Sequence, residues 1–339
     1  MTVPAQITDL VATGGIEQTN LTWTPPVANP AITGYDIELK LNASSIWLRF
    51  IGTGLTVDID IFALTNALYD FRVRAINADG VGPFSDIKTA TPTLISVPLA
   101  GLFNENSVDT NNPVAFWNNQ GTKGSDWDLD TPFGTVTNLT PGTVKGKAIV
   151  QSSGVTGLQT SVTNPLVQPY TIITVAEPTT LDANKNILVR DSISGGITDQ
   201  TISNALGNLF AGNDLPIAVT IPTDQELIII GNYQASPNAN VRVILNDGST
   251  DVNASGNAGN NNFELDTVMW QSNQAANRDY KGKLPEIRVY DGNLSVDETY
   301  AVIGAYQQKW WDGFPEIASI PVSAFTKAGK LSVSIGINL

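Results

Sequence analysis

The sequence has no cysteine and no histidine among its 339 residues. Without cysteine there are neither disulfide bonds nor thiolate nucleophiles. Without histidine the Ser-His-Asp arrangement of many hydrolases is excluded, and the two absences together remove the usual zinc ligands. Any catalysis would therefore have to use carboxylates, lysine or tyrosine.

Positive charge is scarce as well. Lysine and arginine total 18 against 32 aspartate and glutamate residues, which gives a net charge of -14 and a pI near 4.3. A chain with this charge is repelled by the phosphates of nucleic acids and by anionic membranes. We therefore expect neither nucleic acid nor a membrane as a partner.

Long hydrophobic runs are also missing. No stretch of 18 apolar residues occurs, and the N-terminal "MTVPAQITDLVATGG" lacks the basic and apolar segments of a secretion signal. If Met1 is the natural start, we expect synthesis in the cytosol without a signal peptide. The absence of cysteine fits maturation under reducing conditions.

Short alternating runs dominate residues 1–92. "NLTWT", "GYDIELK" and "YDFRVRAIN" each place apolar side chains on one face and polar side chains on the other, with proline and glycine between the runs. This pattern is typical of half-buried antiparallel strands. The hydrophobic fraction of 42% is that of a globular protein, and the length suggests two domains or one large one. The spacing of the strands predicts a first β-sandwich of about 90 to 100 residues.

This first region resembles a fibronectin type III module. The residues that carry the resemblance are Pro4, Trp23, Tyr35, Leu64, Tyr69, Phe71, Val73, Ala75, Asn77, Gly80, Gly82, Pro83 and Ser85. The resemblance implies that Trp23 fills the core, and that Leu64 and Tyr69 form a corner in which the tyrosine hydroxyl bonds back to the backbone. The Arg-Gly-Asp tripeptide of integrin-binding members does not occur. We expect Trp47 to pack at the sandwich edge rather than to bind a ligand.

Residues 93–98 are predicted to be a linker, and residues 99–314 a second domain rich in strands. Asn246, Asp247 and Gly248 predict a hairpin turn because positive φ angles are easily adopted there. After the strands, Ser295 and Glu298 form a capping box at the start of a helix. Apolar residues at helical spacing, Val302, Ile303, Tyr306 and Trp310, predict that this helix packs across the second sandwich.

The second region resembles the concanavalin A-like, laminin-G-like sandwich that is common in bacterial and bacteriophage surface proteins. The matching pieces are "FWNNQGTKGSDW", the hairpin "LNDG" and the closing "YKGKLPEIRVYDGNLSVDETYAVIGAYQQKWW". The expected fold class is all-β. An immunoglobulin-like fibronectin type III sandwich precedes a larger concanavalin-like jelly roll with one C-terminal helix.

The segment "FELDTVMW", residues 263–270, resembles the catalytic strand of concanavalin-like glucanases. Glu264 and Asp266 lie on one face of a strand. Retaining glycoside hydrolysis needs a second carboxyl about 5 Å from the first, at position 268 or 269. Val268 and Met269 stand there instead. We therefore predict an ordinary strand and no catalytic residues.

The resemblance to the concanavalin A-like family implies calcium as the candidate cofactor, because members of that family carry it most often. Asp247, Ser249, Asp251 and Asn253 alternate as oxygen donors do in some calcium loops, but the glycine and bidentate glutamate of a well-defined loop are missing. A polar hairpin explains the same residues. We predict no cofactor and keep calcium as the alternative; the ligand-binding residues are unknown from the sequence.

Residues 315–339 form a tail. Pro315 and Pro321 interrupt regular structure, and residues 331–337 then alternate as a strand does. A lone terminal strand is unstable, so it must pair with its own sandwich, with the fibronectin-like module, or with another chain.

Three functions fit the sequence. We expect a non-enzymatic virion protein of a tailed bacteriophage, in a fibre, in the tail or as capsid decoration. Its partners would be other virion proteins, further copies of itself and host-surface glycans. The alternative is a secreted bacterial carbohydrate-binding module. A glycoside hydrolase is disfavoured because the second carboxylate of "FELDTVMW" is missing.

Overall fold

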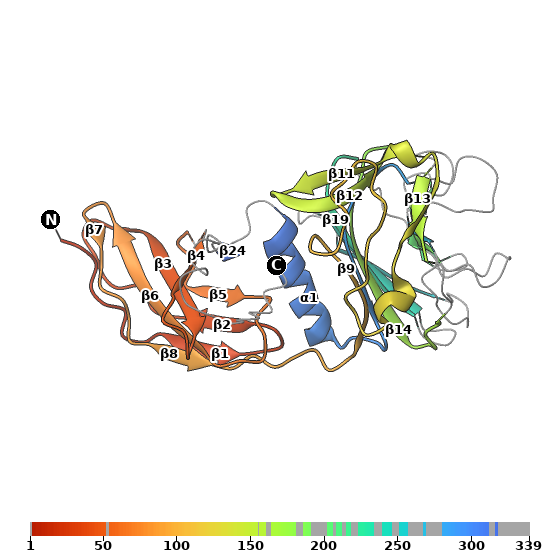
Figure 1. Ribbon diagram of the computed structural model, residues 1–339. Helices are drawn as coiled ribbons and strands as arrows, with labels where there is room; N and C mark the ends of the chain where they lie inside the picture. The colour runs from red at the N-terminus through yellow and green to blue at the C-terminus, as the bar shows by residue number, and fades with distance from the viewer. Residues whose placement is uncertain are drawn as a thin grey trace. The chain divides into compact units, whose positions relative to one another are not determined.

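The computed structural model describes residues 2–51, 54–154, 156–160, 164–180, 186–190, 202–205, 208–211, 215–217, 223–233, 239–245, 251–256, 267–268, 280–311 and 316–317. The fold of these residues is all-β apart from α1 (Val296–Trp310) and the short 3-10 helices η1 (Gly124–Trp127) and η2 (Val136–Asn138). The chain divides into two compact units (Figure 1). One comprises Met1–Ser96 with Val296–Leu339, and the other Val97–Ser295.

The first unit contains a sandwich of two antiparallel sheets. One sheet has the order β1 (Val11–Gly14), β2 (Thr19–Thr22), β5 (Asp58–Ile61). The other has the order β24 (Glu316–Ile317), β4 (Leu48–Ile51), β3 (Ile32–Leu41), β6 (Tyr69–Asn77), β7 (Gly80–Val81), with β8 (Lys88–Ala90) also paired to β6. This is a fibronectin type III-like sandwich, as predicted for residues 1–92.

The core of this sandwich follows the predicted alternation. Ile37, Phe71 and Val73 are fully buried, and the Trp23 ring meets Tyr35 edge-on with 5.1 Å between centroids. Tyr69 forms the expected corner: its hydroxyl accepts a hydrogen bond from the Thr65 backbone N–H at 3.3 Å. The predicted core and corner are confirmed.

The second unit has two larger sheets. The first runs β10 (Thr131–Gly134), β13 (Thr156–Gln159), β22 (Thr267–Val268), β15 (Asn186–Arg190), β16 (Ile202–Ala205), β17 (Asn208–Ala211), β18 (Leu215–Ile217). The second runs β11 (Leu139–Val144), β12 (Lys147–Ser152), β23 (Gly282–Tyr290), β14 (Tyr170–Pro178), β19 (Leu227–Tyr233), β20 (Ala239–Leu245), β21 (Asp251–Gly256), with β9 (Leu99–Phe103) on β23.

The core of the second unit contains large aromatic residues among its aliphatic side chains. Trp117 and Trp127 are fully buried, and Phe103 meets Trp117 edge-on with 5.7 Å between centroids. The expected hairpin is consistent with the pairing of β20 and β21, whose register places Ile244 opposite Asp251. Its turn residues, 246–248, lie outside the described residues.

Helix α1 begins directly after Ser295, as predicted, but its grouping differs from the predicted domain bounds of 99–314. It belongs to the compact unit of the fibronectin-like module. The physical reason is a set of contacts with Asp60 and Phe62, made by the side chains of Tyr300 and Gln308. Among the described residues, no helix has the length and apolarity needed to cross a membrane.

The start of the tail also joins the first unit. Glu316 and Ile317 pair with Ile51 and Phe50 at the edge of β4. The residues predicted to form the terminal strand, 331–337, lie outside the described residues.

Candidate interaction surface

The outer face of β3 and β6 carries a ladder of opposite charges. Apolar residues at alternate positions of both strands fill the core, so the intervening side chains face outward. The register sets three pairs opposite one another: Asp36 with Arg74, Glu38 with Arg72, and Lys40 with Asp70. Each strand therefore carries both signs of charge, and every charge on one strand lies opposite the other sign on its neighbour.

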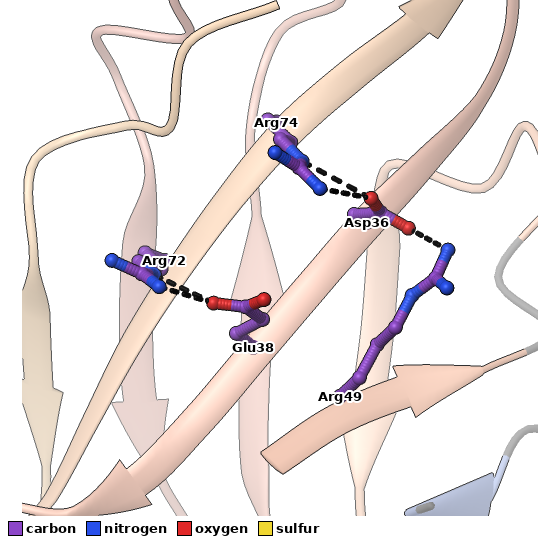
Figure 2. Close-up of polar contacts among 5 residues, drawn as sticks. All are labelled: Asp36, Glu38, Arg49, Arg72 and Arg74. Carbon is purple, nitrogen blue, oxygen red and sulfur yellow. Dashed lines mark hydrogen bonds and ion pairs between the residues drawn. The ribbon is translucent and has the colours of Figure 1, made fainter. Parts of the chain in front are cut away.

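All three pairs are in contact, and Figure 2 shows the two that involve Arg72 and Arg74. Arg74 donates to Asp36 from Nε at 3.0 Å and from Nη2 at 2.9 Å. Arg72 Nε donates to Glu38 at 2.8 Å, and Lys40 Nζ lies 2.6 Å from Asp70. Figure 2 also shows a third guanidinium, from Arg49 on β4, which donates to the second carboxylate oxygen of Asp36. Asp36 thus holds arginines from two neighbouring strands.

Two aromatic rings support the cations. The guanidinium carbon of Arg72 lies 4.1 Å from the centroid of Trp47 and 4.1 Å from that of Phe84. Arg74 lies 4.3 Å from Phe84, and Lys40 lies 5.3 Å from Trp47. Such cation–π contacts contribute about 0.5–1 kcal/mol each at exposed sites. The predicted packing role of Trp47 agrees with these contacts.

Hydrogen bonding controls the ionisation of Asp70. Burial acts to raise its pKa, but hydrogen bonds from Asn42 and Lys40 outweigh burial and hold the pKa below its ordinary value. Asp70 therefore stays ionised at neutral pH and keeps its pair with Lys40.

The face combines order with partial exposure. Four cations, Lys40, Arg49, Arg72 and Arg74, meet three anions, Asp36, Glu38 and Asp70, which leaves a net charge of +1 on a chain of net charge -14. The Arg49 side chain is 58% exposed. On this face the carboxylates are bound to cations, and Arg72 and Arg74 lie against aromatic rings. The surface is therefore suited to contact with a partner of complementary charge.

Only two residues of the glucanase-like segment, Thr267 and Val268, belong to the described part of the chain. Glu264, Asp266 and Met269 lie outside the described residues. Val268 is in β22, where it pairs with Leu158 of β13 and Val189 of β15. The predicted strand character is confirmed for Thr267 and Val268.

Only two of the four candidate calcium ligands belong to the described residues. Asp247 and Ser249 lie outside the described residues. Asp251 and Asn253 belong to β21, opposite Ile244 and Arg242. Within the described ranges, no group of three or more acidic residues is arranged to hold a metal ion.

Polar residues near the start of the second unit bond to its own backbone. Asn119 Oδ1 accepts hydrogen bonds from the N–H groups of Leu102 and Gly121. Asp109 accepts from the N–H groups of Asn111 and Ala115. The resulting order of these loops comes from side chains that serve as structural caps.

The charged ladder was not predicted from the sequence. A signal was present, because "DIELK" and "DFRVR" carry complementary charges when they are read in opposite directions. It becomes specific only when Leu39 is known to lie opposite Phe71.

No protein family model matches the sequence. Among solved structures, the chain is similar to the sixth fibronectin type III domain from human fibronectin type III domain containing protein 3. The identity is 26%, with 27% of this chain and 90% of that chain covered and a TM-score of 0.24. The chain is also similar to the FN5 domain of Drosophila Lar, with 21% identity and a TM-score of 0.23. This match covers 27% of this chain and 98% of that chain.

The chain is also similar to titin kinase and its flanking domains. The identity is 26% over 26% of this chain, the TM-score is 0.24, and the match spans 17% of that structure. The fibronectin type III-like assignment itself rests on the strand order and the tyrosine corner.

Proposed function

We propose that this chain is a non-enzymatic structural protein of the virion surface of a tailed bacteriophage, in a fibre, in the tail or as capsid decoration. In this proposal, the fibronectin-like module docks onto other virion proteins. The second unit is a concanavalin-like, laminin-G-like sandwich that is displayed to the surroundings and contacts host-surface glycans.

The observation that carries the proposal is the charged face of β3, β4 and β6. Asp36 is bonded to two arginines, and Glu38 to one, so these carboxylates serve to hold strands together. Arg72 lies against two aromatic rings, which fixes the guanidinium in place. A rigid face of mixed charge supports protein contact, because opposite charges on a partner set orientation and association rate.

The composition supports the same role. An acidic chain without cysteine suits assembly in a reducing cytosol, and the asparagine-rich sequence of the second unit supplies amide groups of the kind that form hydrogen bonds to sugars. Virion proteins, including further copies of this chain, are the proposed primary partners. Glycan binding is a secondary role.

Binding to particles tests the docking role. Purified protein is mixed with virions that lack it, and co-sedimentation is measured. Arg49→Glu, which reverses the most exposed charge of the face, should reduce the bound fraction. The control Lys88→Glu makes the same change of charge on β8 of the same module and should bind normally. Equal binding of the two variants would show that the face does not dock.

A glycan array tests the secondary role. Binding to bacterial surface polysaccharides is expected from the second unit. Absence of binding across such an array would leave the second unit with a structural role alone.

A further inference from the structure

Strand β5 lies at the edge of its sheet in the first unit. Among the described residues, it is the last strand of the order β1, β2, β5 and pairs with β2 alone. The other edge presents backbone N–H and C=O groups that need partners, and such edges promote association between chains.

Helix α1 supplies those partners through one side chain. The amide of Gln308 accepts a hydrogen bond from the Phe62 N–H at 3.2 Å and donates one to the Asp60 C=O at 3.4 Å. These two groups are the ones that a neighbouring strand would use, since residues i and i+2 point to the same side. The Gln308 side chain therefore takes the place of a paired strand.

Two further residues of α1 contact the same site. The Tyr300 hydroxyl donates to the Asp60 carboxylate at 2.8 Å, and its ring meets the Phe62 ring edge-on at 5.6 Å. Gly304 lies so close to Phe62 that a Cβ atom would be 2.3 Å from the ring. Tyr300, Gly304 and Gln308 are spaced four residues apart and lie on one face of the helix.

The edge of β5 that Gln308 covers is complementary to itself. In an antiparallel pair with a two-fold axis at Ile61, the Phe62 N–H of each copy would meet the Asp60 C=O of the other. This geometry bonds the same two groups that Gln308 bonds in one chain. It sets Asp60 opposite Phe62 rather than opposite another aspartate, so no like charges face each other directly.

We propose that α1 is a latch that blocks the β5 edge against pairing with a second copy of this chain. The stripe Tyr300, Gly304 and Gln308 determines the fit of the latch. Opening it frees the edge, and two copies then join their three-stranded sheets through β5. The neighbouring sheet is closed in a similar way, because β24 pairs with the edge of β4.

Gln308→Leu in the full chain tests the latch, because leucine has a similar size but forms no hydrogen bonds. Sedimentation velocity over a dilution series should show a dimer for this variant and a monomer for the control Gln307→Leu. Hydrogen exchange should show a protected Phe62 amide in the wild type and rapid exchange in the diluted variant. Continued protection of that amide, or a monomer whose amide exchanges rapidly, would contradict the proposal.

Disulfide trapping provides a second test that tolerates a weak dimer. The chain has no native cysteine, so introduced thiols are the only ones. An equal mixture of Asp60→Cys and Phe62→Cys chains should form a mixed disulfide under mild oxidation, because these positions face each other across the proposed axis. A mixture of Asp58→Cys and Phe62→Cys chains is out of register and should react much less. Equal yields from the two mixtures would overturn the predicted pairing.

Discussion

Gly304 of α1 lies against the ring of Phe62, with no space for a side chain between them. A Cβ at this position would stand 2.3 Å from both Cε1 and Cζ of the ring. The two residues are far apart in the sequence, and this contact brings the C-terminal helix onto the module formed by the first 96 residues.

Gly304→Ala should therefore destabilise the protein, although alanine normally stabilises a helix relative to glycine by about 0.5–1 kcal/mol. Overpacking against Phe62 is expected to cost about 1–3 kcal/mol. Urea denaturation measures the difference in the free energy of unfolding. In a Phe62→Ala background the same substitution should become neutral or stabilising. A stabilising effect in the wild-type background would show that the helix is not held against Phe62.

Asp36→Asn should weaken the charged ladder more than Glu38→Gln. Asp36 pairs with Arg49 and Arg74, whereas Glu38 pairs with Arg72. Because the arginines are partly exposed, we expect a loss of about 1 kcal/mol for Asp36→Asn and about half of that for Glu38→Gln. Thermal unfolding at low and high salt measures both. The loss of stability caused by each substitution should be smaller at high salt because screening weakens exposed ion pairs.

Asp109 should contribute to acid sensitivity. Burial acts to raise its pKa, but hydrogen bonds from the N–H groups of Asn111 and Ala115 outweigh burial and lower the pKa below its ordinary value. A lowered pKa in the folded state gives stability above the unfolded pKa, and this stability is lost as the pH falls through the folded value. Urea denaturation at a series of pH values measures this effect. The free energy of unfolding should fall less on acidification for Asp109→Asn than for the wild type. An acid loss of stability in Asp109→Asn equal to that of the wild type would contradict this role.

Tyr300 should titrate late on the alkaline side. Burial, followed by the hydrogen bond and charge of Asp60, raises its pKa to about 12. A raised pKa in the folded state gives stability that is fully present below the unfolded value near 10 and is lost as the pH rises through about 12. Ultraviolet difference spectra of wild type minus Tyr300→Phe measure this titration, and Asp60→Asn should shift it towards its ordinary value. A midpoint unaffected by Asp60→Asn would contradict the contact.

The purified protein should release no reducing sugar from β-glucans, agars or carrageenans, since the second carboxylate of the glucanase pattern is replaced by Val268 or Met269. A reducing-sugar assay measures this directly. Activity that is abolished by Glu264→Gln would show that the strand is catalytic after all.

The first sandwich was predictable because its signals are local. Alternation in "YDFRVRAIN" fixes which side chains enter the core, and the spacing of Leu64 and Tyr69 indicates the corner. The second unit gave the same local signals, so its strands and its β20–β21 pairing could be expected. The sequence does not determine which strands pair or in what register. The charged ladder depends on both, because it forms only when β3 pairs with β6 in the observed register.

The position of α1 shows the same limit. Val302, Tyr306 and Trp310 predict an amphipathic helix, and all three are buried. Periodicity says nothing about which domain the helix joins. The residues that place it, Tyr300, Gly304 and Gln308, are aromatic, small and polar, and become a recognisable stripe only beside Asp60 and Phe62.

Quantitative mass spectrometry of purified bacteriophage particles tests the central claim most directly. The account predicts that peptides from both units band with the particles at a constant ratio to the major capsid protein through a density gradient. Detection of the protein only in the culture medium of uninfected bacteria, and never in the particle band, would contradict it.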